Sequence, residues 1–212
     1  PVPTPEYLHC ASHQPNALPP NSSPNPILII LDLNGALLHR SRGSKATQSS
    51  KRPHPRPYLT QFLNYLFAHF SVMVWSSALP ANVASMVAAA FTPEQRERLV
   101  AVWGRDTLGL SKEQMYAKVV VYKRLEKVWE SVGLSKGGKR GGVWSQANTV
   151  LVDDSAVKAS AQPFNLVEIS TWEGGQDGAK DRELLEVAGY LEKMRRGKWV
   201  DVSAWMRMRP FR

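Results

Sequence analysis

The chain of 212 residues is 43% hydrophobic and 21% charged, with a formal net charge of +9 and a single cysteine. This composition is that of a globular protein long enough to bury a core, and it argues against wholesale disorder. The lone Cys10 excludes an internal disulfide and a multi-cysteine metal site, and no apolar run reaches the roughly 18 residues that a membrane-spanning helix requires.

The first part of the chain changes character at residue 27. Residues 1–26 are rich in proline, asparagine and serine, and we expect an extended arm without regular structure, ahead of a single domain over 27–212. No signal-peptide pattern is present at the start. Five apolar residues lead directly into Asp32, which predicts a buried strand over 27–32. Residues 39–57 are basic, serine-rich and interrupted by prolines, which predicts a surface loop.

The rest of the chain alternates between apolar runs of strand length and stretches with helical spacing. This alternation predicts an α/β fold, a three-layer sandwich with a central parallel sheet flanked by helices. A loop rich in glycine, lysine and arginine is expected over 133–142. The predicted helices cover 58–70, 82–90, 93–99, 112–132 and 181–196, with a break of the fourth near 119–121 as an alternative. The predicted strands cover 71–75, 100–103, 149–152 and 166–169.

Polar side chains follow three of the predicted strands. Asp32 ends the first strand, Ser76 follows the second, and Asp153 with Asp154 follows the strand over 149–152. Ligands of parallel sheets bind at the carboxyl ends of the strands, so these side chains are expected to form one site. The alternative is that they are ordinary turn and cap residues.

The spacing Asp32-Leu33-Asn34-Gly35-Ala36-Leu37-Leu38 resembles the first motif of the haloacid dehalogenase-like phosphohydrolases. Three further segments narrow the resemblance to the FCP/SCP branch, which comprises phosphatases of the RNA polymerase II C-terminal domain and their NLI-interacting-factor relatives. The similarity runs from about Ile27 to Trp172. The three segments are Arg56-Pro57-Tyr58-Leu59, Trp75-Ser76-Ser77-Ala78 and Val152-Asp153-Asp154-Ser155, and Gln162-Pro163 with Asn165 also fits.

The resemblance implies a serine/threonine protein phosphatase that acts through an aspartyl-phosphate, with Mg²⁺ as its cofactor. It makes Asp32 the nucleophile, and Ser76 and Ser77 the groups that bind the phosphoryl oxygens. Lys123 would neutralise the charge shared between the phosphoryl group and the nucleophile, although Lys118 and Lys127 lie close by in the sequence. The implied oxygen ligands of Mg²⁺ are Asp32, the backbone carbonyl of Asn34, Asp153 and Asp154.

Arg56 has two interpretations at this stage. Its guanidinium can bind the phosphate of a phosphopeptide in bidentate fashion, which makes it a substrate-binding residue. As the residue before Pro57, it can equally belong to a turn. Both interpretations stay open.

Two positions depart from the family pattern: Asn34 replaces the usual acid/base aspartate, and Ala36 replaces the usual threonine. An asparagine cannot protonate a leaving group, and the loss of a general acid costs about 10²–10⁴ in rate. Two functions follow. The chain is either an attenuated phosphatase, or a catalytically weak or inactive pseudophosphatase that binds phosphopeptides or proteins, as the mitochondrial translocase subunit of this branch illustrates.

The net charge of +9 favours an acidic partner, such as a phosphoprotein or an acidic peptide. Because basic residues are spread over many segments, a generally basic surface explains the charge equally well. Binding of nucleic acid would rest on charge alone. We expect an intracellular protein in the nucleus or cytoplasm, with a mitochondrial location as the alternative.

Overall fold

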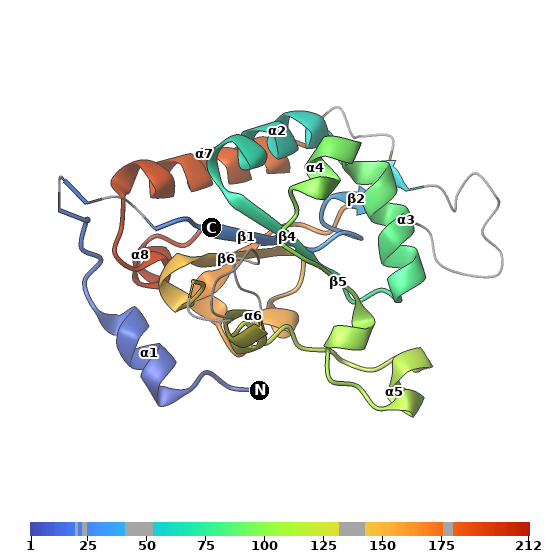
Figure 1. Ribbon diagram of the computed structural model, residues 1–212, viewed down its shortest axis with the longest axis horizontal. Coiled ribbons are helices and arrows are strands. Elements are labelled where there is room, and N and C mark those ends of the chain that lie inside the picture. Colours follow the sequence, from blue (N-terminus) through green and yellow to red (C-terminus); the bar gives the residue numbers. More distant parts are fainter. Residues whose placement is uncertain (20, 23–24, 41–52, 132–142, 176–179) are drawn as a thin grey trace.

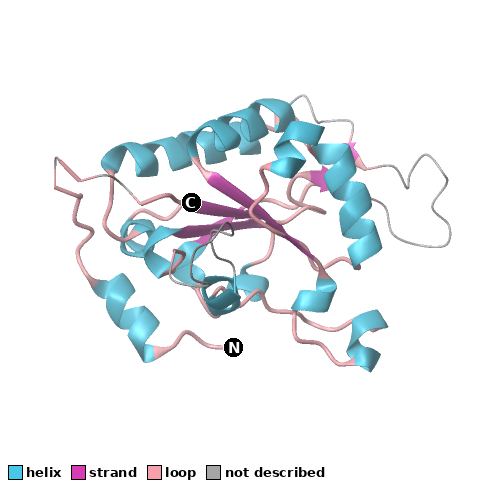
Figure 2. Cartoon of the chain, viewed as in Figure 1, coloured by secondary structure: helices cyan, strands magenta, loops and turns pink. Residues whose placement is uncertain are grey.

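The structure, a computed structural model, describes residues 1–19, 21–22, 25–40, 53–131, 143–175 and 180–212. Its centre is a parallel sheet in the order β5-β4-β1-β6-β7, with helices above and below it in Figures 1 and 2. Because β1 pairs with β4 on one side and with β6 on the other, it is the central strand. The strands are β1 (Leu28–Leu31), β4 (Ser71–Trp75), β5 (Val102–Trp103), β6 (Thr149–Asp153) and β7 (Leu166–Glu168).

The helices form the outer layers of the molecule. One face of the sheet is covered by α2 (Leu59–His69), α3 (Pro80–Ala90), α4 (Pro93–Glu97) and α7 (Glu183–Gly197), and α6 (Glu126–Ser131) lies on the other face (Figure 1). α8 (Val202–Met208) packs on α1 (Pro5–Ser12) and on the turns that precede β6 and β7. The short α5 (Lys112–Tyr116) lies to one side of the layers.

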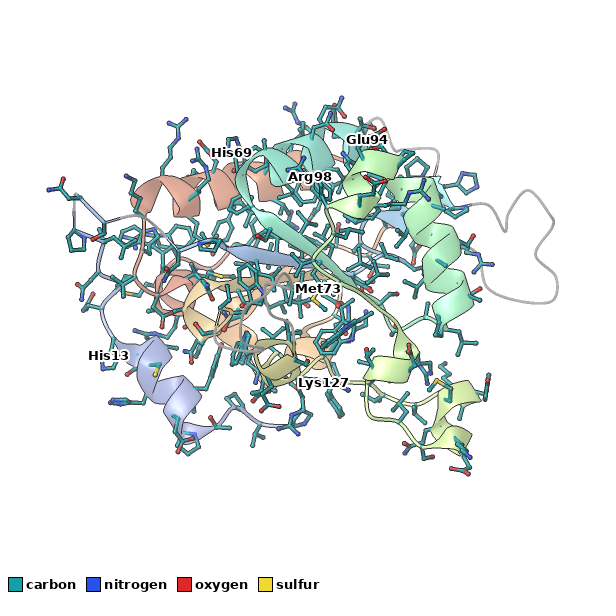
Figure 3. All side chains as sticks on the ribbon, viewed as in Figure 1. His13, His69, Met73, Glu94, Arg98 and Lys127 are labelled. Atoms are coloured by element: carbon teal, nitrogen blue, oxygen red, sulfur yellow. The ribbon has the colours of Figure 1, made fainter. Side chains whose placement is uncertain are left out.

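Alternate residues of the strands pack into two hydrophobic clusters, one on each face of the sheet. Ile29 and Leu31 belong to the cluster under α2 and α7, whereas Leu28 and Ile30 belong to the cluster beside α6. Burial on both faces explains why the strands are continuous apolar runs. In Figure 3, Met73 of β4 lies in the middle layer. The α/β sandwich predicted from the sequence is confirmed.

The expectation of an arm without regular structure is wrong for residues 5–12, which form α1. Pro5 occupies the first turn, where its missing N–H costs nothing, and Thr4 Oγ1 accepts a hydrogen bond from Tyr7 N at 3.2 Å as the N-cap. The buried Tyr7 hydroxyl donates to Asn165 Oδ1 at 3.0 Å and so fixes the helix to the domain. The arm is therefore part of the fold at this point.

The helical segment expected over 112–132 is interrupted around the break expected near 119–121, and the interruption is longer, because α5 ends at Tyr116 and α6 begins at Glu126. The intervening backbone bonds to other parts of the chain instead: Lys123 N donates to Lys158 O at 2.7 Å, and Leu125 N donates to Gln162 Oε1 at 2.9 Å. These long-range bonds replace the helical ones and bring the Lys123 side chain to the sheet edge.

Two other segments were expected to be loops. The described ends of 39–57 contribute to an antiparallel pair, β2 (Leu38–His39) with β3 (His54–Pro55), while residues 41–52 lie outside the described residues. The basic loop over 133–142 lies outside them as well. The sequence did not predict α8, whose Trp205 is buried in the core. Among the helices of the described residues, none combines the length and the apolar character needed to cross a membrane.

Candidate functional site

Four of the predicted site residues meet at the carboxyl edge of the sheet. Register places Asp32 beside Asp153, because Leu31 pairs with Val152 in the neighbouring strand. Lys123 Nζ lies 3.1 Å from Asp32 Oδ1 and 2.5 Å from Asp153 Oδ2. All three side chains are buried, and Asp154 follows at the rim. The acidic strand ends therefore lie together at this edge, and Lys123 lies against them.

Ser76 stands at the same edge, one residue beyond the end of β4. It is buried, and its Oγ accepts a hydrogen bond from Ala78 N at 3.3 Å, so the hydroxyl hydrogen stays free to serve as a donor. Ser77 borders an open cavity of about 570 Å³ next to the carboxylates. The cavity is also lined by Asn34, His39, Arg40, Asp154, Ser155, Lys158 and Thr171.

Lys158, which the sequence motifs did not indicate as a site residue, comes from the short 3-10 turn Ala156–Ala159 that follows β6. Its Nζ lies 3.1 Å from Asp32 Oδ2, 2.9 Å from Asp153 Oδ1 and 3.0 Å from Asp154 Oδ1. The i, i+4 spacing between Asp154 and Lys158 was the available signal, since one helical turn brings such a pair together. We define the carboxylate cluster as Asp32, Asp153 and Asp154.

Burial and charge act against each other in this cluster. Burial opposes the ionisation of Asp32, but the ammonium groups of Lys123 and Lys158 outweigh it and lower the pKa of that carboxyl. Burial, together with the charge of Asp32, raises the pKa of Asp153 in spite of both lysines. Burial also disfavours the charged form of Lys158, but the three carboxylates outweigh it and raise the pKa of its ammonium.

The carboxylate cluster has the donor chemistry of a site for a hard divalent cation. Asp32, Asp153 and Asp154 each offer an oxygen within 4.8 Å of the others. Asp32 Oδ1 is buried and accepts no hydrogen bond, although it forms an ion pair with Lys123. Carboxylate oxygens are the protein ligands that Mg²⁺ prefers.

Asn34 holds the turn that follows β1. Its Oδ1 accepts a hydrogen bond from Arg40 N at 2.7 Å, so the side-chain carbonyl fixes the start of the segment that leads away from β2. The next residue, Gly35, has φ +91 and donates from its N to Leu38 O at 2.8 Å. A Cβ at Gly35 would lie 2.3 Å from Asp154 Oδ2, so glycine is required for this turn to pass the carboxylate cluster.

Arg56 does not join the site. Its side chain is fully buried and forms an ion pair with Asp181, with Nη2 2.9 Å from Oδ2. Nη1 donates to Ser170 O at 2.8 Å, and Nη2 donates to Ser170 Oγ at 2.7 Å. Of the two interpretations, these contacts favour a structural role in which Arg56 fastens the turn before α2 to the segment after β7.

Replacing Arg56 by methionine is expected to lower the free energy of unfolding by about 3–5 kcal/mol, because the Asp181 carboxylate loses its partner in a mostly buried position. Urea denaturation measures this change, and the exposed Arg96→Met serves as the control. The KM of the folded variant for a phosphopeptide should be unchanged. A raised KM at unchanged stability would return Arg56 to substrate binding.

Similarity to known proteins indicates the same family as the sequence motifs. The family model of NLI interacting factor-like phosphatases matches residues 27–203. An uncharacterized FCP1 homology domain-containing protein of Schizosaccharomyces pombe is 41% identical over 201 residues, which cover 92% of this chain and 80% of the relative. A CTD phosphatase-like protein of Invertebrate iridescent virus 6 is 27% identical over 146 residues, which cover 65% of this chain and 72% of the relative.

Two solved structures share the fold. The structure of Fcp1, an essential RNA polymerase II CTD phosphatase, matches with a TM-score of 0.57 and 12% identity. The match covers 86% of this chain and 70% of the Fcp1 chain. A fission yeast Fcp1 variant bound to beryllium fluoride gives the same coverage, with a TM-score of 0.59 and 10% identity. At this level of identity the likeness concerns the fold alone.

Proposed function

This chain belongs to the family of NLI interacting factor-like phosphatases, and we propose that it is a Mg²⁺-dependent phosphatase that hydrolyses phosphoserine or phosphothreonine in proteins through an aspartyl-phosphate on Asp32. The observation that carries the proposal is the position of Asp32. Its carboxylate is buried at the centre of the sheet edge, kept ionised by two ammonium groups and next to two further carboxylates.

The proposed reaction has two steps at Asp32. A carboxylate oxygen forms a bond to phosphorus while the bond from phosphorus to the seryl oxygen breaks, and the leaving oxygen takes a proton from solvent. Water then attacks the aspartyl-phosphate, which releases inorganic phosphate and restores the carboxylate. The Ser76 hydroxyl donates to a phosphoryl oxygen, and the Lys123 ammonium offsets the charge that spreads toward Asp32.

The carboxylate cluster would hold Mg²⁺ through Asp32, Asp153 and Asp154, whose oxygens are close enough to share one ion. When bound, Mg²⁺ would supply positive charge that offsets the charge of the phosphoryl group. The backbone carbonyl of Asn34 is a further proposed ligand, because Asn34 follows Asp32 by two residues in the turn after β1. The basic surface implied by the charge of +9 suits an acidic phosphoprotein as the substrate.

Turnover is proposed to be slow because of Asn34. Its side-chain oxygen is used by Arg40 N, and its amide cannot donate a proton to an alkoxide. The same observation supports a second candidate function, a pseudophosphatase that binds phosphopeptides in the cavity beside Ser77. A titration with a phosphopeptide and its unphosphorylated twin tests this alternative, and equal binding of the two peptides would exclude it.

Replacing Asp32 by asparagine is expected to reduce Mg²⁺-dependent hydrolysis of an aryl phosphate by roughly 10³-fold or more, because the nucleophile is lost. Release of the aryl alcohol, followed by absorbance, gives the rate. The matched control is Asp106→Asn, which changes an exposed aspartate elsewhere in the chain and should leave the rate unchanged. Equal rates for Asp32→Asn and the original protein would rule out Asp32 as the nucleophile.

A further inference from the structure

The Lys158 ammonium lies where the three carboxylates converge. It contacts one oxygen of each member of the carboxylate cluster, at 2.9 to 3.1 Å. Lys123 also reaches Asp32 and Asp153, but through the other oxygen of each carboxylate. The two lysines thus divide the oxygens between them, and Lys158 alone contacts all three members of the cluster.

Charge makes Lys158 and a divalent cation competitors for this position. With both lysines in contact, the three carboxylates carry a single uncompensated negative charge. A divalent ion added to that arrangement would make the cluster positive and would place two cations against the same oxygens. Repulsion between charges at such a separation is large in a buried site, where water screens it poorly.

Only one of the two lysines can move away from the carboxylate cluster. The Lys123 side chain is fully buried, whereas that of Lys158 is 18% exposed and lines the cavity of about 570 Å³. Lys158 also sits on a short 3-10 turn at the protein surface, so its flexible stem can rotate toward the cavity without disturbing the sheet. A bound divalent cation would therefore displace Lys158 and leave Lys123 in place.

We propose that Lys158 is an internal cation that neutralises the carboxylate cluster in the metal-free protein and moves into the adjoining cavity when a divalent cation binds. This inference rests on the proposed function only in taking the carboxylate cluster as a cation site. After displacement, the ammonium lies in the cavity lined by Ser77, where it faces the phosphoryl group of an incoming phosphopeptide. Binding of the divalent cation thereby exposes a positive charge for the anionic substrate.

Chemical labelling of the original protein tests the displacement directly. Acetylation of lysines by acetic anhydride, measured by mass spectrometry, is expected to be slow at Lys158 in EDTA and at least about tenfold faster in saturating Mg²⁺, because the ammonium leaves three ion pairs. The exposed Lys193 is the internal control and should react equally in both conditions. Equal labelling of Lys158 with and without Mg²⁺ would overturn the proposal.

A variant tests the competition independently. Lys158→Met keeps most of the length of the side chain and removes its charge, so titration calorimetry with Mg²⁺ or Mn²⁺ should show at least about tenfold tighter binding than in the original protein. Lys193→Met should bind as the original does. If Lys158→Met fails to fold, Lys158→Gln replaces it. Equal or weaker cation binding by the folded variant, including no binding by either protein, would contradict the inference.

The outcomes separate this inference from the proposed function. If the protein does not hydrolyse an aryl phosphate but its Lys158 becomes reactive in Mg²⁺, the proposed displacement of Lys158 stands and the proposed enzymatic activity fails. If the protein hydrolyses the aryl phosphate with Mg²⁺ but its Lys158 stays unreactive, the proposed enzymatic activity stands and the proposed displacement of Lys158 fails.

Discussion

Replacing Asn34 by aspartate is expected to raise the rate of phosphoserine peptide hydrolysis by about 10²–10⁴-fold, because it restores a general acid for the seryl oxygen. The turn after β1 can accept this change. Arg40 N donates to Asn34 Oδ1, and a carboxyl oxygen can accept the same hydrogen bond while the second oxygen carries the proton. The geometry of the carboxylate cluster should therefore be preserved.

Two substrates make this test specific. An aryl phosphate has a leaving group that needs little protonation, so Asn34→Asp should accelerate it much less than the phosphoserine peptide. Rates of phosphate release are measured for both substrates in the presence of Mg²⁺. The control Asn16→Asp introduces the same charge at an exposed position and should leave both rates unchanged. If no protein hydrolyses either substrate, the enzymatic proposal fails and the binding function remains.

Replacing Lys123 by methionine is expected to lower the free energy of unfolding by about 3–5 kcal/mol at neutral pH. The Lys123 side chain is fully buried, and its loss leaves the buried Asp153 and Asp32 carboxylates with less compensation. Urea denaturation gives the change, and a double variant that also carries Asp153→Asn should recover part of it, because the unpaired charge is then removed. Lys193→Met is the surface control.

The effect of Lys123→Met should depend on pH in a defined direction. Lys123 lowers the pKa of Asp32 below its ordinary value of 3.8, so the stability that this pair contributes is present above that pH and is lost as the pH falls through the lower, folded-state pKa. In the variant, protonation of the carboxylates at low pH relieves their repulsion. Because burial raises the pKa of Asp153, the difference in unfolding free energy between the two proteins should begin to shrink above the ordinary value of 3.8 and should continue to shrink below it as Asp32 is protonated. A difference that grows in acid would contradict the assignment of Lys123.

Sequence reasoning succeeded where a residue's environment follows from its own neighbours in the chain. The strand β1 is buried on both faces and is therefore an apolar run, and the polar residue that ends it must lie at the sheet edge. The same argument located Asp153 at the carboxyl end of β6. Arg56 and the first 26 residues lacked such a signal. The buried ion pair with Asp181 and the docking of Tyr7 on Asn165 both join segments more than a hundred residues apart.

The sequence by itself determined the α/β architecture, the resemblance to a phosphatase family and the missing acid at Asn34, because these depend on local pattern and on residue identity. Only the tertiary structure decided which lysines lie against the carboxylate cluster. Lys123 stood among neighbouring lysines, and the only signal for Lys158 was its i, i+4 spacing from Asp154. The hydrogen bond from Lys123 N to Lys158 O, together with the pairing of β1 with β6, brings both ammonium groups to Asp32. Such convergence depends on contacts between distant segments, and chain order alone does not contain it.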